Sequence, residues 1–141
     1  MLQRCLWTVV SAVLATGMGK AQSNASAPTA LKQTSPTNGK QMYVNYCASC
    51  HGIDGKGDGP VAQSLKMPPA DLTLLSKNNN GKFPDRHIFA VLQSGADIPS
   101  HGTPEMPVWG PILGELDKAN PDMKKLRISN LIRYLKSIQA N

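Results

Sequence analysis

Three stretches of the chain place apolar residues at the spacing of one helical face, and each predicts a helix. The last stretch, from about residue 123 to 137, has apolar residues three or four positions apart and basic residues on its flanks. A second stretch follows Phe83, which precedes a proline that can start a helix, and should end at Gly95. The first begins at Asn38, whose side chain can cap a helix with Gln41 as its reciprocal partner.

The rest of the sequence carries no strand signal. No stretch alternates apolar and polar residues over the length of a strand, and no hairpin turn separates two such stretches. Pro60 can start one further short helix, to about Leu65, and the glycine-rich segment before it is typical of a turn-rich loop. The pattern therefore predicts an all-α fold.

The N-terminal segment has the pattern of a secretory signal. Residues 1–21 begin with a positive charge, continue as a mostly apolar run and end in small residues, so we expect cleavage after Ala21. Residues 22–37 are rich in Ala, Ser, Thr and Pro, which predicts a flexible linker and leaves 38–141 as the folded domain. We then expect an exported, periplasmic protein. The alternative is an uncleaved 1–21 that serves as a membrane anchor.

Composition narrows the function further. Removal of Arg4 and Lys20 with the signal lowers the net charge from +6 to +4, which is too mild to suggest a nucleic-acid-binding protein. Only 5% of the residues are aromatic, so the core of the domain looks thin. A buried, apolar prosthetic group would supply the missing surface for side chains to pack against.

The cysteines indicate which group that is. Cys5 lies in the predicted signal, whereas Cys47, Cys50 and His51 form a C-x-x-C-H motif. A disulfide oxidoreductase would place C-x-x-C in a βαβ unit, and zinc would need a second pair of ligands at short spacing. Covalent haem needs two thiols and an adjacent imidazole on one turn, which this motif provides. The single motif predicts one haem c, with His51 as an axial ligand of its iron.

The second axial ligand has several candidates. Met106 lies far along the chain in a loop stiffened by prolines, which gives it the reach to approach the other face of a haem. His101 and His87 are the alternatives, and Met67 is only a short path from His51. We expect Met106 to be the ligand, although a lone methionine more often fills a core.

At this point the chain resembles the class I c-type cytochromes, a family of mono-haem bacterial cytochromes c. The resemblance covers 38–141 and rests on the residues of the first helix, the attachment motif, the ligand loop and the last helix: Gly39, Tyr43, Cys47, Cys50, His51, Met106, Pro107, Leu131 and Tyr134. It implies a small cytochrome c fold whose helices wrap around one haem and whose first and last helices cross near Gly39. In that family a proline carbonyl orients the ligand histidine, and here Pro68 or Pro69 would supply it.

The resemblance also implies a function. We expect one-electron transfer by a soluble or tethered carrier of a respiratory chain, which docks transiently with redox partner proteins and is not itself an enzyme. The alternative is a cytochrome c subunit of a larger oxidoreductase complex. A third hypothesis, a five-coordinate haem enzyme or gas sensor, requires that Met106 does not bind the iron. Membrane association is expected only if residues 1–21 stay uncleaved, and no nucleic-acid partner is expected.

Overall fold

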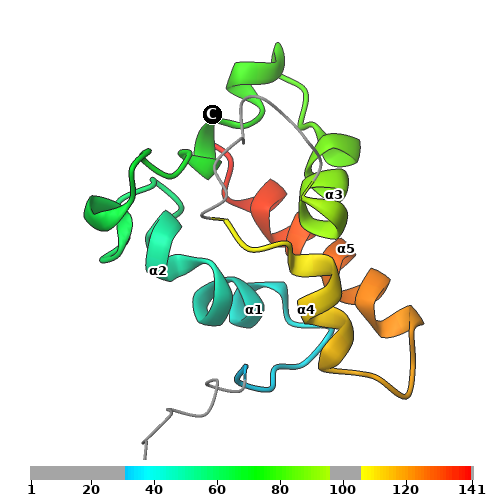
Figure 1. Ribbon diagram of the computed structural model, residues 1–141. Coiled ribbons are helices and arrows are strands. Elements are labelled where there is room, and N and C mark those ends of the chain that lie inside the picture. The colour runs from blue at the N-terminus through cyan, green and yellow to red at the C-terminus, as the bar shows by residue number, and fades with distance from the viewer. Residues whose placement is uncertain (1–30, 96–105, 141) are drawn as a thin grey trace, which may run out of the picture. The chain divides into compact units, whose positions relative to one another are not determined.

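The computed structural model describes residues 31–95 and 106–140, and every regular element in that part is helical (Figure 1). The prediction of an all-α fold is confirmed. The predicted signal, 1–21, lies outside the described residues. The α-helices are α1 (Gly39–Tyr46), α2 (Ala48–His51), α3 (Asp85–Ser94), α4 (Trp109–Glu115) and α5 (Asp122–Ser137). Three short 3-10 turns cover Ala62–Ser64, Leu72–Leu74 and Lys77–Asn79.

Helices α1 and α5 pack directly against each other, as the resemblance implied. A side-chain carbon on Gly39 would overlap the carbonyl oxygen of Asn130 and would lie 3.0 Å from the Cβ of Tyr134. Glycine is therefore required at the start of α1, because any larger residue would push the two helices apart. One turn further along, the rings of Tyr43 and Tyr134 pack with their centroids 5.1 Å apart. The crossing joins the two ends of the domain.

Helix α4 was not predicted, because it contains two glycines and a proline. Pro111 lies in its first turn, where a backbone N–H has no partner inside the helix, so the proline removes no hydrogen bond there. Gly110 faces the backbone of Gln93, and a side-chain carbon on it would overlap that carbonyl oxygen. Trp109 is buried and stacks on Tyr46 with 5.8 Å between ring centroids. Helix α4 thus fixes the end of the segment that carries Met106.

The start of the domain differs from the prediction. Of the predicted linker 22–37, residues 31–37 are described, and they belong to the same compact unit as the helices. Thr34 is buried, its hydroxyl lies 2.7 Å from that of Tyr46, and Asn130 donates a hydrogen bond to the carbonyl of Pro36. The linker prediction is wrong for 31–37, because polar contacts hold this segment and the Leu31 side chain packs against the hydrophobic core.

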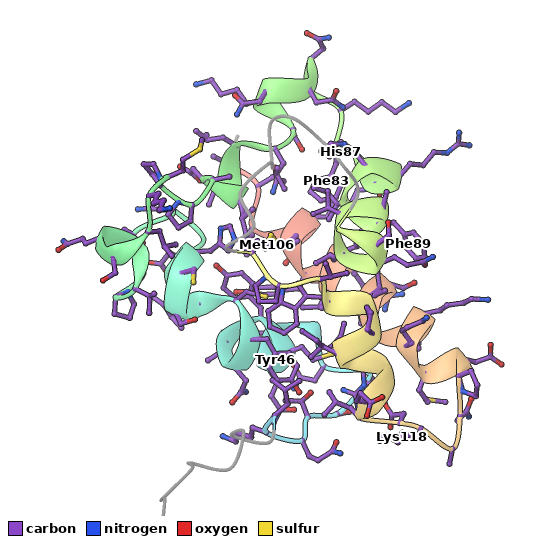
Figure 2. The ribbon with its side chains drawn as sticks, in the orientation of Figure 1. Tyr46, Phe83, His87, Phe89, Met106 and Lys118 are labelled. Atoms are coloured by element: carbon purple, nitrogen blue, oxygen red, sulfur yellow. The ribbon has the colours of Figure 1, made fainter. Side chains whose placement is uncertain are left out.

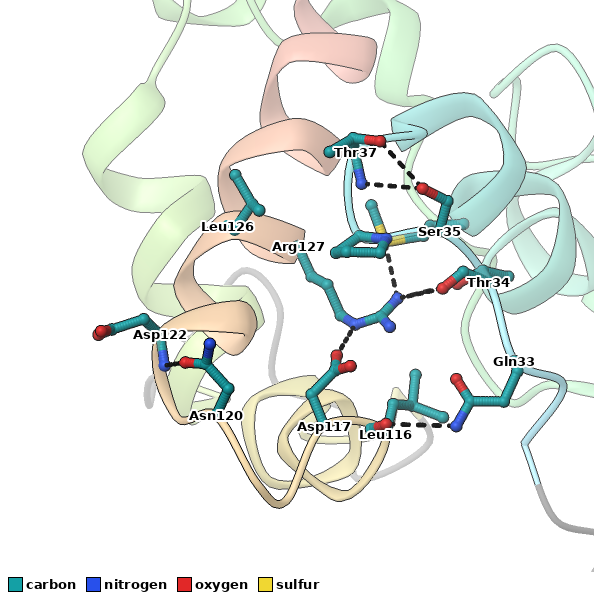
Figure 3. Close-up of polar contacts among 12 residues, drawn as sticks. Gln33, Thr34, Ser35, Thr37, Leu116, Asp117, Asn120, Asp122, Leu126 and Arg127 are labelled. Carbon is teal, nitrogen blue, oxygen red and sulfur yellow. Dashed lines mark hydrogen bonds and ion pairs between the residues drawn. The ribbon is translucent and has the colours of Figure 1, made fainter.

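A buried arginine organises those contacts (Figure 3). Arg127 of α5 is 1% exposed and forms an ion pair with Asp117, with 2.6 Å between Nε and Oδ2. Its Nη1 donates to the carbonyl and the hydroxyl of Thr34, at 2.9 and 3.0 Å, and lies 3.7 Å from the sulfur of Met42. One side chain therefore joins segment 31–37, α1, α5 and the segment that follows α4.

The helix boundaries largely match the predicted ones. Asn38 caps α1 by accepting from the backbone N–H of Gln41, although the Gln41 side chain accepts from Ser35 and does not complete a capping box. Gly95 ends α3 in a left-handed conformation, as expected. The short helix predicted after Pro60 is reduced to the 3-10 turn Ala62–Ser64.

The C-terminal residues hold a distant segment in place. The Gln139 side chain accepts from the backbone N–H of Ser76 and donates to the carbonyls of Leu72 and Leu135. The backbone N–H of Ala140 donates to the carbonyl of Thr73 at 2.9 Å. Within the part of the chain that the structure describes, no helix has the length and apolar character needed to span a membrane.

Candidate functional site

The C-x-x-C-H motif folds into one tight turn at the end of α1. The backbone N–H of Cys47 donates to Tyr43, and the N–H groups of Cys50 and His51 both donate to the carbonyl of Cys47. Cys47 and Cys50 are free thiols, and both are half-buried. Burial, reinforced by the nearby Cys50, raises the pKa of Cys47 to about 12. Two thiols and an imidazole therefore emerge from five consecutive residues, as the motif predicted.

The His51 ring is held by a backbone carbonyl. Its Nδ1 lies 3.0 Å from the oxygen of Ala70, and because a carbonyl can only accept, Nδ1 carries the proton. The prediction that Pro68 or Pro69 supplies this carbonyl is wrong by one residue, since the two prolines set the extended path but Ala70 follows them. Burial lowers the pKa of His51, and the Ala70 hydrogen bond opposes that shift. The imidazole is thus kept neutral, with its other nitrogen available.

The glycine-rich loop after His51 supports the position of the His51 backbone. Gly57 donates its N–H to the carbonyl of His51 and has a φ of 81°, which only glycine adopts without strain. A side-chain carbon there would also overlap the carbonyl oxygen of Pro69. The hydroxyl of Tyr43, which is fully buried, donates to the carbonyl of Gly52 at 2.6 Å. The loop consequently fits between α1 and the segment that presents Ala70.

An apolar cavity opens beside this turn. Cys47, His51 and Met106 all line it, together with Tyr43. In Figure 2, Met106 lies between α2 and α3, on the segment that leads into α4. The other described residues of the lining are all aliphatic and come from α3, α5 and the turn at 72–74: Leu72, Ile88, Val91, Leu92, Leu131 and Leu135.

The competing ligand candidates that the structure describes do not line this cavity. Met67 is 58% exposed and does not line the cavity. Met42 is buried against Arg127, and His87 of α3 is not among the cavity residues. His101 lies outside the described residues. Across 31–95 and 106–140, no group of three or more His, Cys, Asp or Glu side chains could hold a metal ion.

These residues fit a haem. In the described structure the second nitrogen of His51 has no hydrogen-bond partner, although it belongs to a residue that lines the cavity. The Met106 thioether, the Cys47 thiol and an aliphatic surface also line the cavity, and the second free thiol, Cys50, lies on the same turn. A soft sulfur ligand, an imidazole and thiols that can form thioethers are the donors that haem c requires.

Comparison with known proteins supports the same conclusion. The family model described as "Cytochrome C oxidase, cbb3-type, subunit III" matches residues 34–120, which is more than half of the chain. The chain belongs to this family of c-type cytochromes. The resemblance inferred from the sequence is thereby confirmed. No curated protein and no solved structure matches the chain.

Membership of a cytochrome c family implies covalently bound haem c and a role in electron transfer. The match begins at residue 34, which agrees with the packing of residues 31–37 against the helices. Sequence reasoning missed one residue that shapes the site, Ala70, whose carbonyl contacts the His51 ring. The available signal was its position directly after the proline pair Pro68-Pro69.

Proposed function

We propose that this cytochrome is a one-electron carrier with a single haem c, attached through Cys47 and Cys50 and ligated by His51 and Met106. The observation that carries the proposal is the hydrogen bond between His51 Nδ1 and the carbonyl of Ala70. It leaves the other ring nitrogen able to bind a metal ion, and both His51 and Met106 line the same cavity. When bound, haem supplies an iron centre that gains and loses one electron.

Residues around the cavity would determine the ligand geometry, the reduction potential and the reactivity of the iron. Ala70 fixes the tautomer and orientation of the His51 ring, and such outer contacts tune the basicity of a ligand. The aliphatic lining keeps water out of the cavity. Exclusion of water helps to set the reduction potential of a bound haem and limits side reactions. With His51 and Met106 both used as ligands, no position is left for a substrate. Electron transfer is then the function, and catalysis by this domain alone is not expected.

Attachment can be tested by the haem content of denatured protein. We expect one haem per chain by haemochrome absorbance and a peroxidase-active band on a denaturing gel. Cys47→Ala combined with Cys50→Ala should abolish that band, whereas Ser49→Ala, between the two thiols, should keep it. Haem that acid acetone extracts from the wild-type protein would refute covalent attachment.

Ligation by Met106 can be tested by optical spectroscopy. The oxidised protein should show a weak far-red charge-transfer band from sulfur to iron, and Met106→Ala should lose it. Met67→Ala is the matched control, because that methionine is exposed and should leave the band unchanged. Reduced wild-type protein should not bind carbon monoxide at neutral pH, and rapid binding would favour the five-coordinate enzyme or sensor.

The family description favours a second candidate, a cytochrome c subunit of a larger oxidoreductase complex. Chromatography of the native protein after mild solubilisation separates the two, since a carrier elutes alone and a subunit elutes with its complex. Export to the periplasm is part of the proposal and rests on residues 1–21. N-terminal sequencing of the mature protein should begin after Ala21, and a retained start would indicate an anchor.

A further inference from the structure

A groove of about 540 Å³ runs along the outer surface between α3 and α5. Two half-buried apolar side chains, Phe89 of α3 and Ile132 of α5, lie in it. In Figure 2, Phe89 projects from the side of α3 away from Met106. Neither Phe89 nor Ile132 lines the haem cavity, so the groove is a separate feature of the same two helices.

The rim of this groove is basic. Arg86 and Arg133 are exposed, and within the described structure neither has an ion-pair partner. Lys136 is also at the rim, 3.5 Å from a carboxylate oxygen of Asp85, so this pair contributes almost no net charge. The groove therefore presents two uncompensated positive charges beside an apolar floor.

The periodicity of α5 extends the basic rim. Lys125 is exposed and lies one helical turn before Ser129, which itself lines the groove. Residues 125, 129, 132 and 136 are spaced three or four positions apart and so share one face of the helix. That face carries Ile132 near its centre and the exposed Lys125 at one end, whereas Lys136 at the other end is paired with Asp85. With Arg86 and Arg133, the groove has an apolar floor and a basic rim, which complement a helix with an apolar stripe and acidic flanks.

We propose that this groove, lined by α3 and α5, is a docking site for an acidic, amphipathic helix of a partner protein. Helix-in-groove recognition places apolar anchors in a recessed floor and leaves charge pairs at the rim. Phe89 and Ile132 are recessed and partly covered, whereas binding to a lipid surface would need protruding apolar side chains. A partner held here would contact the outer side of the helices whose inner side lines the haem cavity.

The position of the groove also indicates the type of contact. Ile88 and Leu92 of α3 and Leu131 and Leu135 of α5 face the cavity, so the docked helix would be separated from it by these two elements. The groove is therefore suited to hold the domain on a lasting partner, while the surface near Cys47 and Cys50 stays available for transient redox encounters.

A direct test uses the haem-loaded protein and a synthetic helical peptide of 18 residues with a leucine stripe flanked by glutamates. Calorimetry should detect binding to the wild-type protein. Arg86→Glu combined with Arg133→Glu should weaken it at least tenfold, because two attractions become repulsions. The control is Lys40→Glu combined with Lys77→Glu, which makes the same change in net charge at exposed positions away from the groove and should bind like the wild type.

A second variant tests the contribution of the apolar floor of the groove. Ile132→Ser should also weaken peptide binding severalfold while the haem spectrum stays unchanged, and raised salt should weaken the wild-type complex. Several results would overturn the proposal. These are no binding below about 1 mM, equal weakening by the control pair, or tighter binding to phosphatidylglycerol vesicles than to the peptide. Self-association that the groove variants abolish would identify a second copy as the occupant and would overturn it as well.

Discussion

The crossing of α1 and α5 and the haem cavity are built from the same helices but by opposite means. At the crossing, protein groups satisfy one another: Gly39 fits against the backbone of Asn130, and Arg127 has a partner for its charge and for its hydrogen bonds. In the cavity, most of the described lining residues are aliphatic, and the second nitrogen of His51 has no partner among the described residues. The crossing is complete as a protein interface, whereas the cavity requires an added group.

This difference separates two kinds of effect that substitutions should have. A change at the crossing should lower the free energy of unfolding without altering the spectrum of the folded protein, since Gly39, Asn130 and Arg127 do not line the cavity. A change in the cavity should alter the spectrum first. Tyr43 belongs to both regions, because it packs on Tyr134 and also lines the cavity.

The largest effect on stability is expected from Asp117→Ala. It would leave the charge of Arg127, which is 1% exposed, without a partner, and breaking a buried pair in this way costs about 3–5 kcal/mol. Denaturant unfolding of the haem-loaded protein measures the loss. Glu115→Ala is the matched control: it removes a carboxylate from the exposed pair with Lys118 and should leave the free energy of unfolding almost unchanged.

The same pair allows a sharper comparison. Asp117→Ala combined with Arg127→Met should be less destabilised than Asp117→Ala alone, because no buried charge remains. If the double variant is as unstable as the single one, the hydrogen bonds from Arg127 to Thr34 matter more than the charge. A change in the far-red band of folded Asp117→Ala would show that the two regions are not independent.

A somewhat smaller effect is expected from Gly39→Val. The added carbons would overlap the Asn130 carbonyl, and overpacking of this kind costs about 2–3 kcal/mol. Gly114→Ala in α4 is the control, because its nearest neighbour, the Lys124 side chain, would be 3.7 Å away. Alanine at that position should be neutral or mildly stabilising. An unchanged unfolding midpoint for Gly39→Val would mean that the helices can separate without penalty.

The smallest effect is expected from Tyr43→Phe, at about 1 kcal/mol, because it removes one buried hydrogen bond to Gly52. Burial, more than the charges nearby, raises the pKa of Tyr43 above its ordinary value of 10.0. The folded state then keeps a proton that the unfolded state loses, so this contribution is complete below pH 10 and declines as the pH rises above it. The difference between wild type and Tyr43→Phe should therefore shrink above pH 10 in unfolding experiments.

The sequence predicted those parts of the fold that local patterns encode. Apolar spacing and end signals located α3 and α5, and Asn38 correctly marked the start of α1. Helix α4 could not be found in this way, because the glycine that argues against a helix is required by contact with Gln93, far away in the sequence. Residues 31–37 were missed for a related reason: hydrogen bonds to a buried arginine hold them, and composition does not report such bonds.

The sequence predicted a chemistry for the site but not its detail. The spacing of Cys47, Cys50 and His51 indicates a group that needs two thiols and an imidazole, and ligation by Met106 stays a prediction. The backbone conformation after the proline pair decides which carbonyl accepts the hydrogen bond from His51. The acceptor is Ala70, one residue beyond Pro69. The position of Ala70 relative to His51 is set by the contacts that Gly55 and Gly57 of the opposing loop make with this segment. These contacts join residues that are distant in the sequence, so local patterns do not reveal them.

The contacts of Gln139 and Ala140 have a practical consequence for protein engineering. These residues form hydrogen bonds to Leu72, Thr73 and Ser76, on the segment that follows Ala70. A stop codon or a tag junction placed before Gln139 would release that segment next to the carbonyl that orients His51. Purification tags should therefore be joined only after residue 141, through a spacer that leaves both residues in place.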